Sequence, residues 1–290
     1  MYMPKSERSS FSVTTAGAVI HGTLQGHGPP VILLHGGPGC YDYFAGSAAV
    51  EWLAGSHLVC SYDQRGCRGS ASSGPFTIQA NVADLEAVRQ YLEAERIGVL
   101  GHSAGAMLGA SYIARHPDRV EWFVALSPAG QGSKFRAVFD RTIRQRATPD
   151  QRQSLEEIDA LIRRTDDPRE REELYRRHFE KALPCYVDPG HRDRAPRMEY
   201  FSREVSVQVM ASFLALCRDP AWRASLQRFP GRSGIIHGRT DPIPWMVVDE
   251  WAALLPRAEV YPLDRCGHFP WLEEPDACRA ALFAFLHADG

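Results

Sequence analysis

Three residues that can together activate a hydroxyl group occur along the chain in a recognisable order. Ser103 lies in GHSAG (101–105), a G-x-S-x-G pattern that directly follows one apolar run and precedes a helix-like one. A serine hydroxyl is inert alone and needs a base, and the base needs an orienting group. Asp241 in GRTDPIP and His268 in CGHFPWLEEP each follow a later strand-like run. This order predicts Ser103 as nucleophile, Asp241 as orienting acid and His268 as base.

Each of these three residues also has an ordinary structural interpretation. GHSAG can be a simple strand-to-helix turn, Asp241 can belong to an Asp-Pro turn, and His268 can pack against neighbouring aromatic rings. A nucleophile elbow strains the serine backbone and requires small neighbours, which Gly101 and Gly105 provide. The joint occurrence in the expected order favours the catalytic interpretation. Other histidines have weaker claims; they are His35, His102 and His237.

The stretch VILLHGGPGCYDYF (31–44) places four apolar residues before a glycine-rich turn. An acyl-transfer site needs fixed N–H donors for the oxyanion that develops during attack. One donor comes from the residue after the nucleophile, here Ala104, and the other from a loop after an earlier strand. We expect Gly37 to supply the second N–H and Gly36 to lie against the substrate, because glycines let the backbone approach closely.

Short apolar runs alternate with helical patterns, which predicts an α/β fold. Residues 10–26 alternate around a glycine turn and predict a hairpin. The apolar runs suit strands that are buried on both faces, and the helical patterns at 82–92 and 107–113 lie between them. Strand and helix in alternation predict a mostly parallel, twisted sheet covered by helices. The six predicted strands are 31–35, 57–63, 97–103, 121–127, 233–238 and 258–264.

The middle of the chain has a different composition. Residues 130–230 are rich in arginine and glutamate and contain few strand-like runs. Thr148 and Asp167 each precede a proline and predict helix starts as N-caps. We therefore expect residues 1–129 and 231–290 to form one core, with residues 130–230 inserted as a helical cap over the sheet.

Composition excludes several classes of function. The chain has 290 residues, a formal net charge of -2 and 44% hydrophobic residues, so a nucleic-acid partner is not expected. The apolar runs are too short to span a bilayer, and the N-terminal residues lack an apolar signal-peptide core, so we expect a cytoplasmic protein without a membrane partner. The seven cysteines show no metal spacing and predict buried free thiols. We expect no metal or cofactor and a monomer or homodimer.

These motifs resemble those of the α/β-hydrolase superfamily and, within it, the proline iminopeptidase group. HGGPG is that group's signature, DQRGCRGS (63–70) is close to its DQRGCGRS, and HGRTD and GHFPWLEEP resemble its acid and histidine segments. Two departures, Ala104 where the group commonly has tryptophan and the exchanged order of Arg68 and Gly69, bear on proline specificity. Asp63 and Arg65 are interpreted as structural supports under HGGPG.

The resemblance implies a serine hydrolase that acts through an acyl-enzyme and releases an N-terminal amino acid from a small peptide or an aminoacylated metabolite. An esterase or lactonase acting on a neutral small molecule uses the same three residues, so that alternative stays open. A ligand-binding protein without catalysis is the alternative from another class. The intact Ser103, Asp241 and His268 argue against it.

An aminopeptidase must also bind a free ammonium group, and burying that charge without a partner costs several kcal/mol. The stretch APRMEYFSREV (195–205) resembles a glutamate-bearing segment in the cap of proline iminopeptidases. We therefore expect Glu199 to bind the amine, with Glu204 as second choice. Tyr200 or Phe201 is expected to form an apolar wall. The alternative is that both glutamates lie on a solvated helix surface.

Overall fold

A computed structural model describes residues 7–132 and 134–288. Its centre is one sheet of eight strands in the order β1-β2-β4-β3-β5-β6-β7-β8. β1 and β2 form an antiparallel hairpin, β2 pairs antiparallel with β4, and all other neighbours are parallel. The strands are β1 (Arg8–Thr15), β2 (Ala18–Gly26), β3 (Pro30–Leu34), β4 (Leu58–Tyr62), β5 (Ile97–His102), β6 (Val120–Leu126), β7 (Arg232–Gly238) and β8 (Glu259–Leu263).

The predicted hairpin and the six predicted strands are confirmed. The strand expected at 31–35 is Pro30–Leu34, and the one expected at 258–264 is Glu259–Leu263. Buried parallel strands carry near-continuous apolar runs, which makes them easy to locate in a sequence. The sheet therefore follows directly from the pattern of apolar residues.

Helices cover both faces of the sheet, and the side chains of β3 show how the two cores are divided. Val31 and Leu33 belong to one apolar cluster, and Ile32 and Leu34 belong to the other, because successive side chains point to opposite faces. One face carries α1 (Ala48–Leu53), α10 (Pro270–Glu273) and α11 (Pro275–His287). The other carries α2 (Ile78–Tyr91), α3 (Ala104–Arg115), α8 (Pro220–Gln227) and α9 (Met246–Leu254).

A long helical segment separates two strands that lie side by side. β6 and β7 are adjacent and parallel, so the chain leaves the sheet at 126 and returns to it at 232. We call residues 130–230 the helical insertion. Within its described residues the structure contains helices and no strand. Its helices before α8 are α4 (Arg136–Arg146), α5 (Pro149–Arg164), α6 (Pro168–Ala182), the 3-10 helices η2 (Leu183–Cys185) and η3 (Pro189–Arg194), and α7 (Arg203–Leu216).

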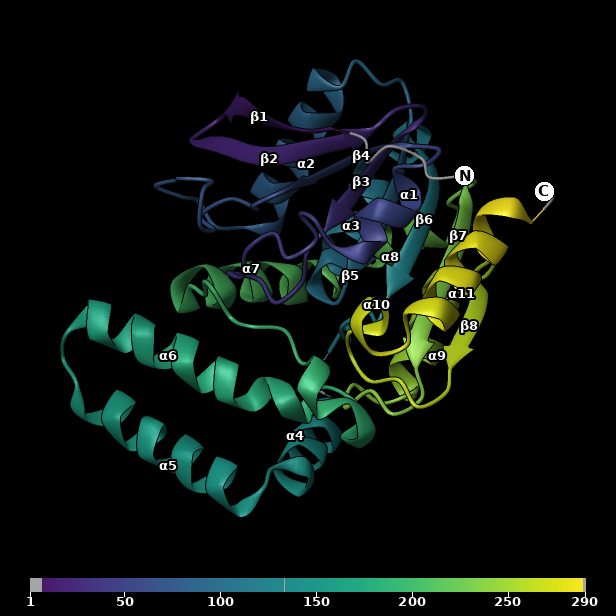
Figure 1. Ribbon diagram of the computed structural model, residues 1–290. Helices are drawn as coiled ribbons and strands as arrows, with labels where there is room; N and C mark the ends of the chain where they lie inside the picture. Colours follow the sequence, from purple (N-terminus) through teal and green to yellow (C-terminus); the bar gives the residue numbers. More distant parts are fainter. Residues whose placement is uncertain (1–6, 133, 289–290) are drawn as a thin grey trace.

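Two pairs of helices in the helical insertion differ in how they meet the core. α5 and α6 pack as an antiparallel pair that projects away from the sheet (Figure 1). α7 and α8 instead contribute Val205, Phe213 and Trp222 to the same buried cluster as α2 and α3. Thr148 forms a capping box with Gln151 at the start of α5, and Asp167 caps α6, as the sequence predicts.

Two further expectations concern composition. All seven cysteines are buried and free, which confirms the interpretation as packed thiols. Among the described residues, no helix has the length and apolar character needed to cross a membrane. A cytoplasmic location stays a prediction.

Candidate active site

Ser103 occupies the sharp turn between β5 and α3. Its backbone has φ 53° and ψ −118°, a left-handed conformation that costs a non-glycine residue energy and is typical of a strained nucleophile elbow. A Cβ on Gly105 would lie 2.0 Å from the carbonyl oxygen of Leu34, so only glycine lets α3 approach β3 this closely. The turn is further fixed by the Ser103 N–H, which donates to the Leu126 carbonyl at 3.0 Å. The serine therefore stands at the N-terminus of α3, at the carboxyl edge of the sheet.

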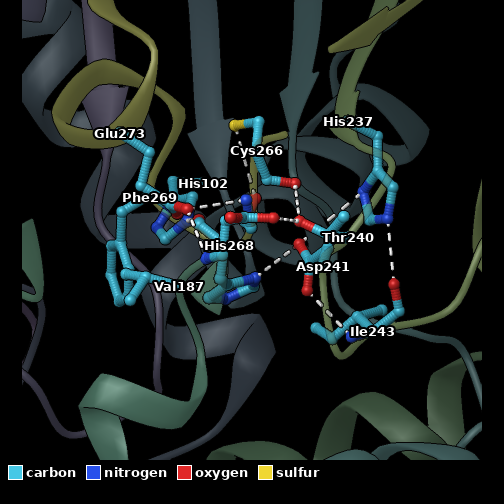
Figure 2. A network of polar contacts seen from close by, with 12 residues as sticks. His102, Val187, His237, Thr240, Asp241, Ile243, Cys266, His268, Phe269 and Glu273 are labelled. Atoms are coloured by element: carbon cyan, nitrogen blue, oxygen red, sulfur yellow. Dashed lines mark hydrogen bonds and ion pairs between the residues drawn. The ribbon is translucent and has the colours of Figure 1, made fainter. Parts of the chain in front are cut away.

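His268 and Asp241 come together from the loops after β8 and β7. Nδ1 of His268 lies 2.8 Å from Oδ2 of Asp241, and both side chains are almost fully buried (Figure 2). A carboxylate only accepts hydrogen bonds, so Nδ1 carries the proton and Nε2 is left with a free lone pair. Oδ1 of Asp241 accepts the N–H of Ile243 at 2.8 Å, which fixes the carboxylate plane. The imidazole is thus held in the tautomer that a general base needs.

Ser103 and His268 line the same cavity, which has a volume of ≈ 530 Å³. Gly37 and Ala104 also line it from the core side. The helical insertion supplies the opposite wall, which is mostly aromatic and apolar. That wall includes Phe135, Phe139, Ile143, Phe179, Tyr186, Met198, Phe201 and Met210.

Two backbone N–H groups beside Ser103 are free to bind an anion. Within the part of the chain that the structure describes, no protein acceptor lies at the N–H of Gly37 or of Ala104. Gly37 has φ 55°, and a Cβ there would lie 2.7 Å from Sγ of Cys40, so the position requires glycine. Ala104 is the first residue of α3, whose dipole adds positive potential at its N-terminus. Both predicted donors therefore belong to residues that line the cavity.

Gly36 has a different environment from the one predicted. A Cβ on Gly36 would lie 2.6 Å from Cβ of Ser103, so the residue packs directly against the elbow. Its N–H donates to the hydroxyl of Tyr43 rather than to the cavity, which Gly36 does not line. Gly36 thus supports Ser103 from behind, and the expectation of a substrate contact is corrected to a packing role.

Tyr43 and His102 form a polar relay that sequence reasoning missed. Nε2 of His102 lies 2.7 Å from the carbonyl oxygen of His268 and donates to it, so Nδ1 accepts the hydroxyl proton of Tyr43. Burial lowers the pKa of His102 well below its usual value, which keeps this ring neutral. The relay joins the Gly36 loop, the elbow and the backbone of His268. The aromatic run after HGGPG was the only sequence signal for it.

The residues predicted to bind an amine do not lie together. Glu199 is 53% exposed, pairs with Arg68 at 3.0 Å and does not line the cavity. Glu204 is exposed on the first turn of α7 and accepts a hydrogen bond from Gln208. Tyr200 packs on the core and donates to the Gly66 carbonyl at 3.2 Å, whereas Phe201 does line the cavity. The structure thus supports only Phe201 as a cavity wall, because the 199–204 segment turns its glutamates to solvent.

Two carboxylates that were not singled out from the sequence do line the cavity. Asp140 on α4 pairs with Arg136 at 3.0 Å, and Asp159 on α5 lies 3.3 Å from Nε2 of His178. Both are on the helical insertion. They sit within a charge-rich helical pattern that gives no sequence signal for a cavity.

The polar residues beneath HGGPG divide into two groups. Asp63 accepts the N–H of Asp42 at 2.7 Å and that of Gly69 at 3.0 Å, so it braces the segment after HGGPG as expected. Arg65 instead forms a buried ion pair with Asp84 on α2 and donates to the β1–β2 turn, which corrects its predicted position. His35 is buried and accepts the N–H of Gln64, and burial lowers its pKa to about 4.

A metal centre is not apparent in the described part of the chain, where no three histidine, cysteine, aspartate or glutamate side chains gather in a ligand cluster. His237 is the remaining buried histidine near the site. Its Nε2 donates to the Ile243 carbonyl at 2.9 Å, and its Nδ1 lies 3.9 Å from Oδ2 of Asp241. His237 therefore flanks the acid on the side away from His268 (Figure 2).

Comparison with known proteins agrees with this geometry. Residues 29–275 match the family model described as the alpha/beta hydrolase fold. The chain belongs to this family. It is similar to a proline iminopeptidase of Heyndrickxia coagulans, with 25% identity over 91% of this chain and 92% of that protein.

Solved structures of other alpha/beta hydrolases share the fold. Naproxen esterase from Bacillus subtilis superposes with a TM-score of 0.67 at 16% identity and covers 97% of this chain and 92% of its own. Est816, described as an N-acyl homoserine lactone degrading enzyme, has a TM-score of 0.63 at 21% identity and covers 94% and 99%. At these identities the likeness shows the alpha/beta hydrolase fold alone.

Proposed function

We propose that this alpha/beta hydrolase is a serine hydrolase that uses Ser103, His268 and Asp241 as a triad. One observation carries the proposal: Ser103, His268 and two unbonded backbone N–H groups line one cavity, and Asp241 fixes the tautomer of His268. A hydrophobic cavity with a few convergent polar groups is the usual form of such a site.

The first half of the reaction forms an acyl-enzyme. Nε2 of His268 takes the proton from Ser103 Oγ as Oγ bonds to the substrate carbonyl carbon. The N–H groups of Gly37 and Ala104 hold the resulting oxyanion, which such donors stabilise by several kcal/mol. When the intermediate collapses, the bond to the leaving group breaks and the imidazolium of His268 gives its proton to that group. Asp241 stays ionised and stabilises the imidazolium.

The second half of the reaction releases the carboxylic acid product. A water molecule replaces the leaving group, and His268 takes a proton from it as its oxygen attacks the acyl carbon. The oxyanion forms again in the same N–H pair. Collapse then breaks the ester bond to Ser103, which recovers its proton from His268. The cycle needs no group beyond the chain and water.

The preferred substrate is an amide whose acyl part is an N-terminal amino acid, in a small peptide or an aminoacylated metabolite. The supporting observation is similarity to a proline iminopeptidase along nearly the whole chain. The helical insertion acts as a cap whose aromatic wall binds an apolar side chain, and Asp140 and Asp159 place carboxylates in the same cavity. We expect monomers or homodimers without nucleic-acid or membrane partners.

Ester or lactone hydrolysis is the second candidate, and a specific observation favours it. The glutamates predicted to bind an amine lie outside the cavity, and both cavity carboxylates already have a cationic partner or a histidine beside them. An ester of a neutral acid has no ammonium group and therefore needs no carboxylate to bind one. The same triad and oxyanion donors serve both reactions.

A matched substrate panel separates the two candidates. Aminoacyl p-nitroanilides of proline, alanine and phenylalanine are compared with their N-acetylated forms and with p-nitrophenyl esters of butyrate and phenylacetate. The amidase proposal predicts kcat/KM roughly 10² higher for the free amine than for the N-acetyl form, the size of a lost buried ion pair. Preference for the neutral esters with no gain from a free amine favours the esterase. Hydrolysis of neither class contradicts both.

A further inference from the structure

The histidine of the triad is held by a segment of the helical insertion and by one buried carboxylate. Glu273 has no exposed surface, and its two oxygens accept the N–H groups of Gly267 at 2.7 Å and Phe269 at 2.8 Å. These two residues flank His268. The N–H of His268 itself donates to the carbonyl of Tyr186 at 3.0 Å. Three successive amides around the base therefore have fixed partners, and Figure 2 shows Glu273 beside His268 and Phe269.

The same segment of the helical insertion reaches the loop that carries the acid. The N–H of Asp188 donates to Oε2 of Glu273 at 2.7 Å, and Oδ2 of Asp188 accepts the hydroxyl of Thr240 at 2.7 Å. Thr240 is the residue before Asp241. Asp188 thus connects the His268 loop, through Glu273, to the Asp241 loop, through Thr240.

The contact is close along the backbone as well as through side chains. A Cβ on Gly267 would lie 2.5 Å from the Tyr186 carbonyl oxygen and 2.7 Å from the Asp188 nitrogen, so only glycine permits this approach. Arg146 on α4 adds a second link, because its guanidinium donates to the Val187 carbonyl at 3.0 Å and also to the Thr240 carbonyl. Residues 186–188 are therefore wedged between the two catalytic loops.

Burial and hydrogen bonds at this junction shift the pKa values of Glu273 and Asp188. Burial raises the pKa of Glu273, although three N–H groups that favour the ionised form oppose that effect. Burial also acts to raise the pKa of Asp188, but hydrogen bonds from Gly190 N–H and the Thr240 hydroxyl outweigh it and leave the pKa lowered. Asp188 consequently stays an acceptor for Thr240 at neutral pH.

We propose that Asp188 and Glu273 are positioning residues that make residues 186–188 of the helical insertion part of the catalytic machinery, setting the relation between His268 and Asp241. The proposal rests on the triad proposed above. The segment does more than cover the cavity: it orients the base and the acid together. Motion that separated residues 186–188 from the core would leave the chain folded but loosen the His268–Asp241 hydrogen bond.

The test compares Asp188→Ala with Asp219→Ala. Asp219 is a matched control, because it also caps a helix of the insertion and accepts the N–H two residues ahead at 2.8 Å, but it is solvent-exposed. Asp188 accepts the Gly190 N–H at the same 2.8 Å and has the Thr240 contact in addition. Thr240→Val removes that contact together with the 2.9 Å contact of the Thr240 hydroxyl to the Cys266 carbonyl, and it serves as a second variant if Asp188→Ala does not fold.

The readouts are the rate of fluorophosphonate labelling at Ser103, resolved into kinact and KI, and the low-field proton resonance of the His268 Nδ1–H. Asp188→Ala and Thr240→Val are expected to lower kinact by about 10- to 10²-fold with KI unchanged, since small misplacement of a catalytic group costs that much. The resonance should broaden or shift in both. Asp219→Ala should keep the wild-type kinact and resonance.

Three results would overturn the inference. Equal kinact in Asp188→Ala and Asp219→Ala, with thermal stability lowered in both, makes Asp188 a cap only. A rise in KI with kinact unchanged makes the segment a binding wall. An unchanged His268 resonance in Thr240→Val removes the link to the acid loop. Wild-type protein that fails to label at Ser103 contradicts the proposed function itself and is thereby distinguished from these outcomes.

Discussion

Two glutamates show how the carboxyl edge of the sheet differs from the helical insertion. Glu273, the last residue of α10, is wholly buried and accepts three backbone N–H groups. Glu199, on the insertion, is 53% exposed and makes one surface ion pair with Arg68. Surface pairs of this kind contribute about 0–1 kcal/mol. A charged side chain at the sheet edge therefore has a fixed geometry, whereas one on the insertion surface does not.

The difference extends to whole elements. On the exposed surfaces of α4 and α6, charged residues form pairs within one helix, as Arg136 does with Asp140 and Arg176 with Glu180, whereas Arg146 reaches the core. At the sheet edge, polar groups instead join loops that are distant in sequence, as His102 does with His268. Sequence changes at the edge should consequently affect turnover of every substrate, and changes on the insertion surface should affect few or none.

The largest effect is expected for Asp241→Asn. An amide in place of the carboxylate can donate to Nδ1 of His268 and so favours the tautomer that cannot take the proton from Ser103. We expect kcat to fall by about 10⁴ on esters and amides alike, with KM little changed. The change is measured by steady-state kinetics on both substrate classes. A loss confined to one class contradicts a common triad.

Gly37→Ala tests the oxyanion donors. The added Cβ would lie 2.7 Å from Sγ of Cys40 on a backbone with φ 55°, so the Gly37 N–H must shift away from the cavity. Removal of one oxyanion donor costs about 10²–10³ in kcat. Gly132→Ala on the insertion is the matched control, since a Cβ there meets nothing within 4 Å. Equal activity of the two variants would remove Gly37 from the site.

Asp42→Asn tests the burial of charge at the sheet edge. Burial raises the pKa of Asp42 from 3.8 to about 6, so the folded state keeps this proton after the unfolded state has lost it. Between these values the free energy of unfolding of the wild type falls as pH rises, by on the order of 3 kcal/mol in total. Asparagine does not titrate, so the free energy of unfolding of the variant should rise by that amount relative to the wild type as the pH goes from 4 to 7. Urea unfolding across this range measures the difference, and a pH-independent difference contradicts it.

The smallest effect is expected for Glu199→Gln. Because the carboxylate is half exposed and lies outside the cavity, its loss should change kcat/KM for free-amine substrates by less than about twofold. A fall of tenfold or more on free amines, with neutral esters unaffected, would instead restore Glu199 as the amine anchor and contradict the placement of the 195–205 segment.

The sheet edge was predictable because its signals are local. Buried strands have continuous apolar runs, and the elbow at Ser103 and the loop at Gly37 need glycine at fixed positions. The insertion was predictable as helix through its caps at Thr148 and Asp167. The sequence did not predict which face of the insertion lines the cavity. Its charged residues are solvated, so tertiary contacts set the orientation of α5 and α6. Contacts such as Asp188 with Glu273 join residues 85 apart and leave no local pattern.

Labelling of Ser103 tests the central claim most directly. Wild-type protein treated with a fluorophosphonate probe should gain one adduct, which peptide mass spectrometry places on Ser103. Ser103→Ala should gain none and should lose on the order of 10⁶ in turnover of the best substrate. Denatured wild-type protein should also remain unlabelled, because the reaction depends on the folded triad. An adduct on another residue, or labelling that persists in Ser103→Ala, would contradict Ser103 as the nucleophile.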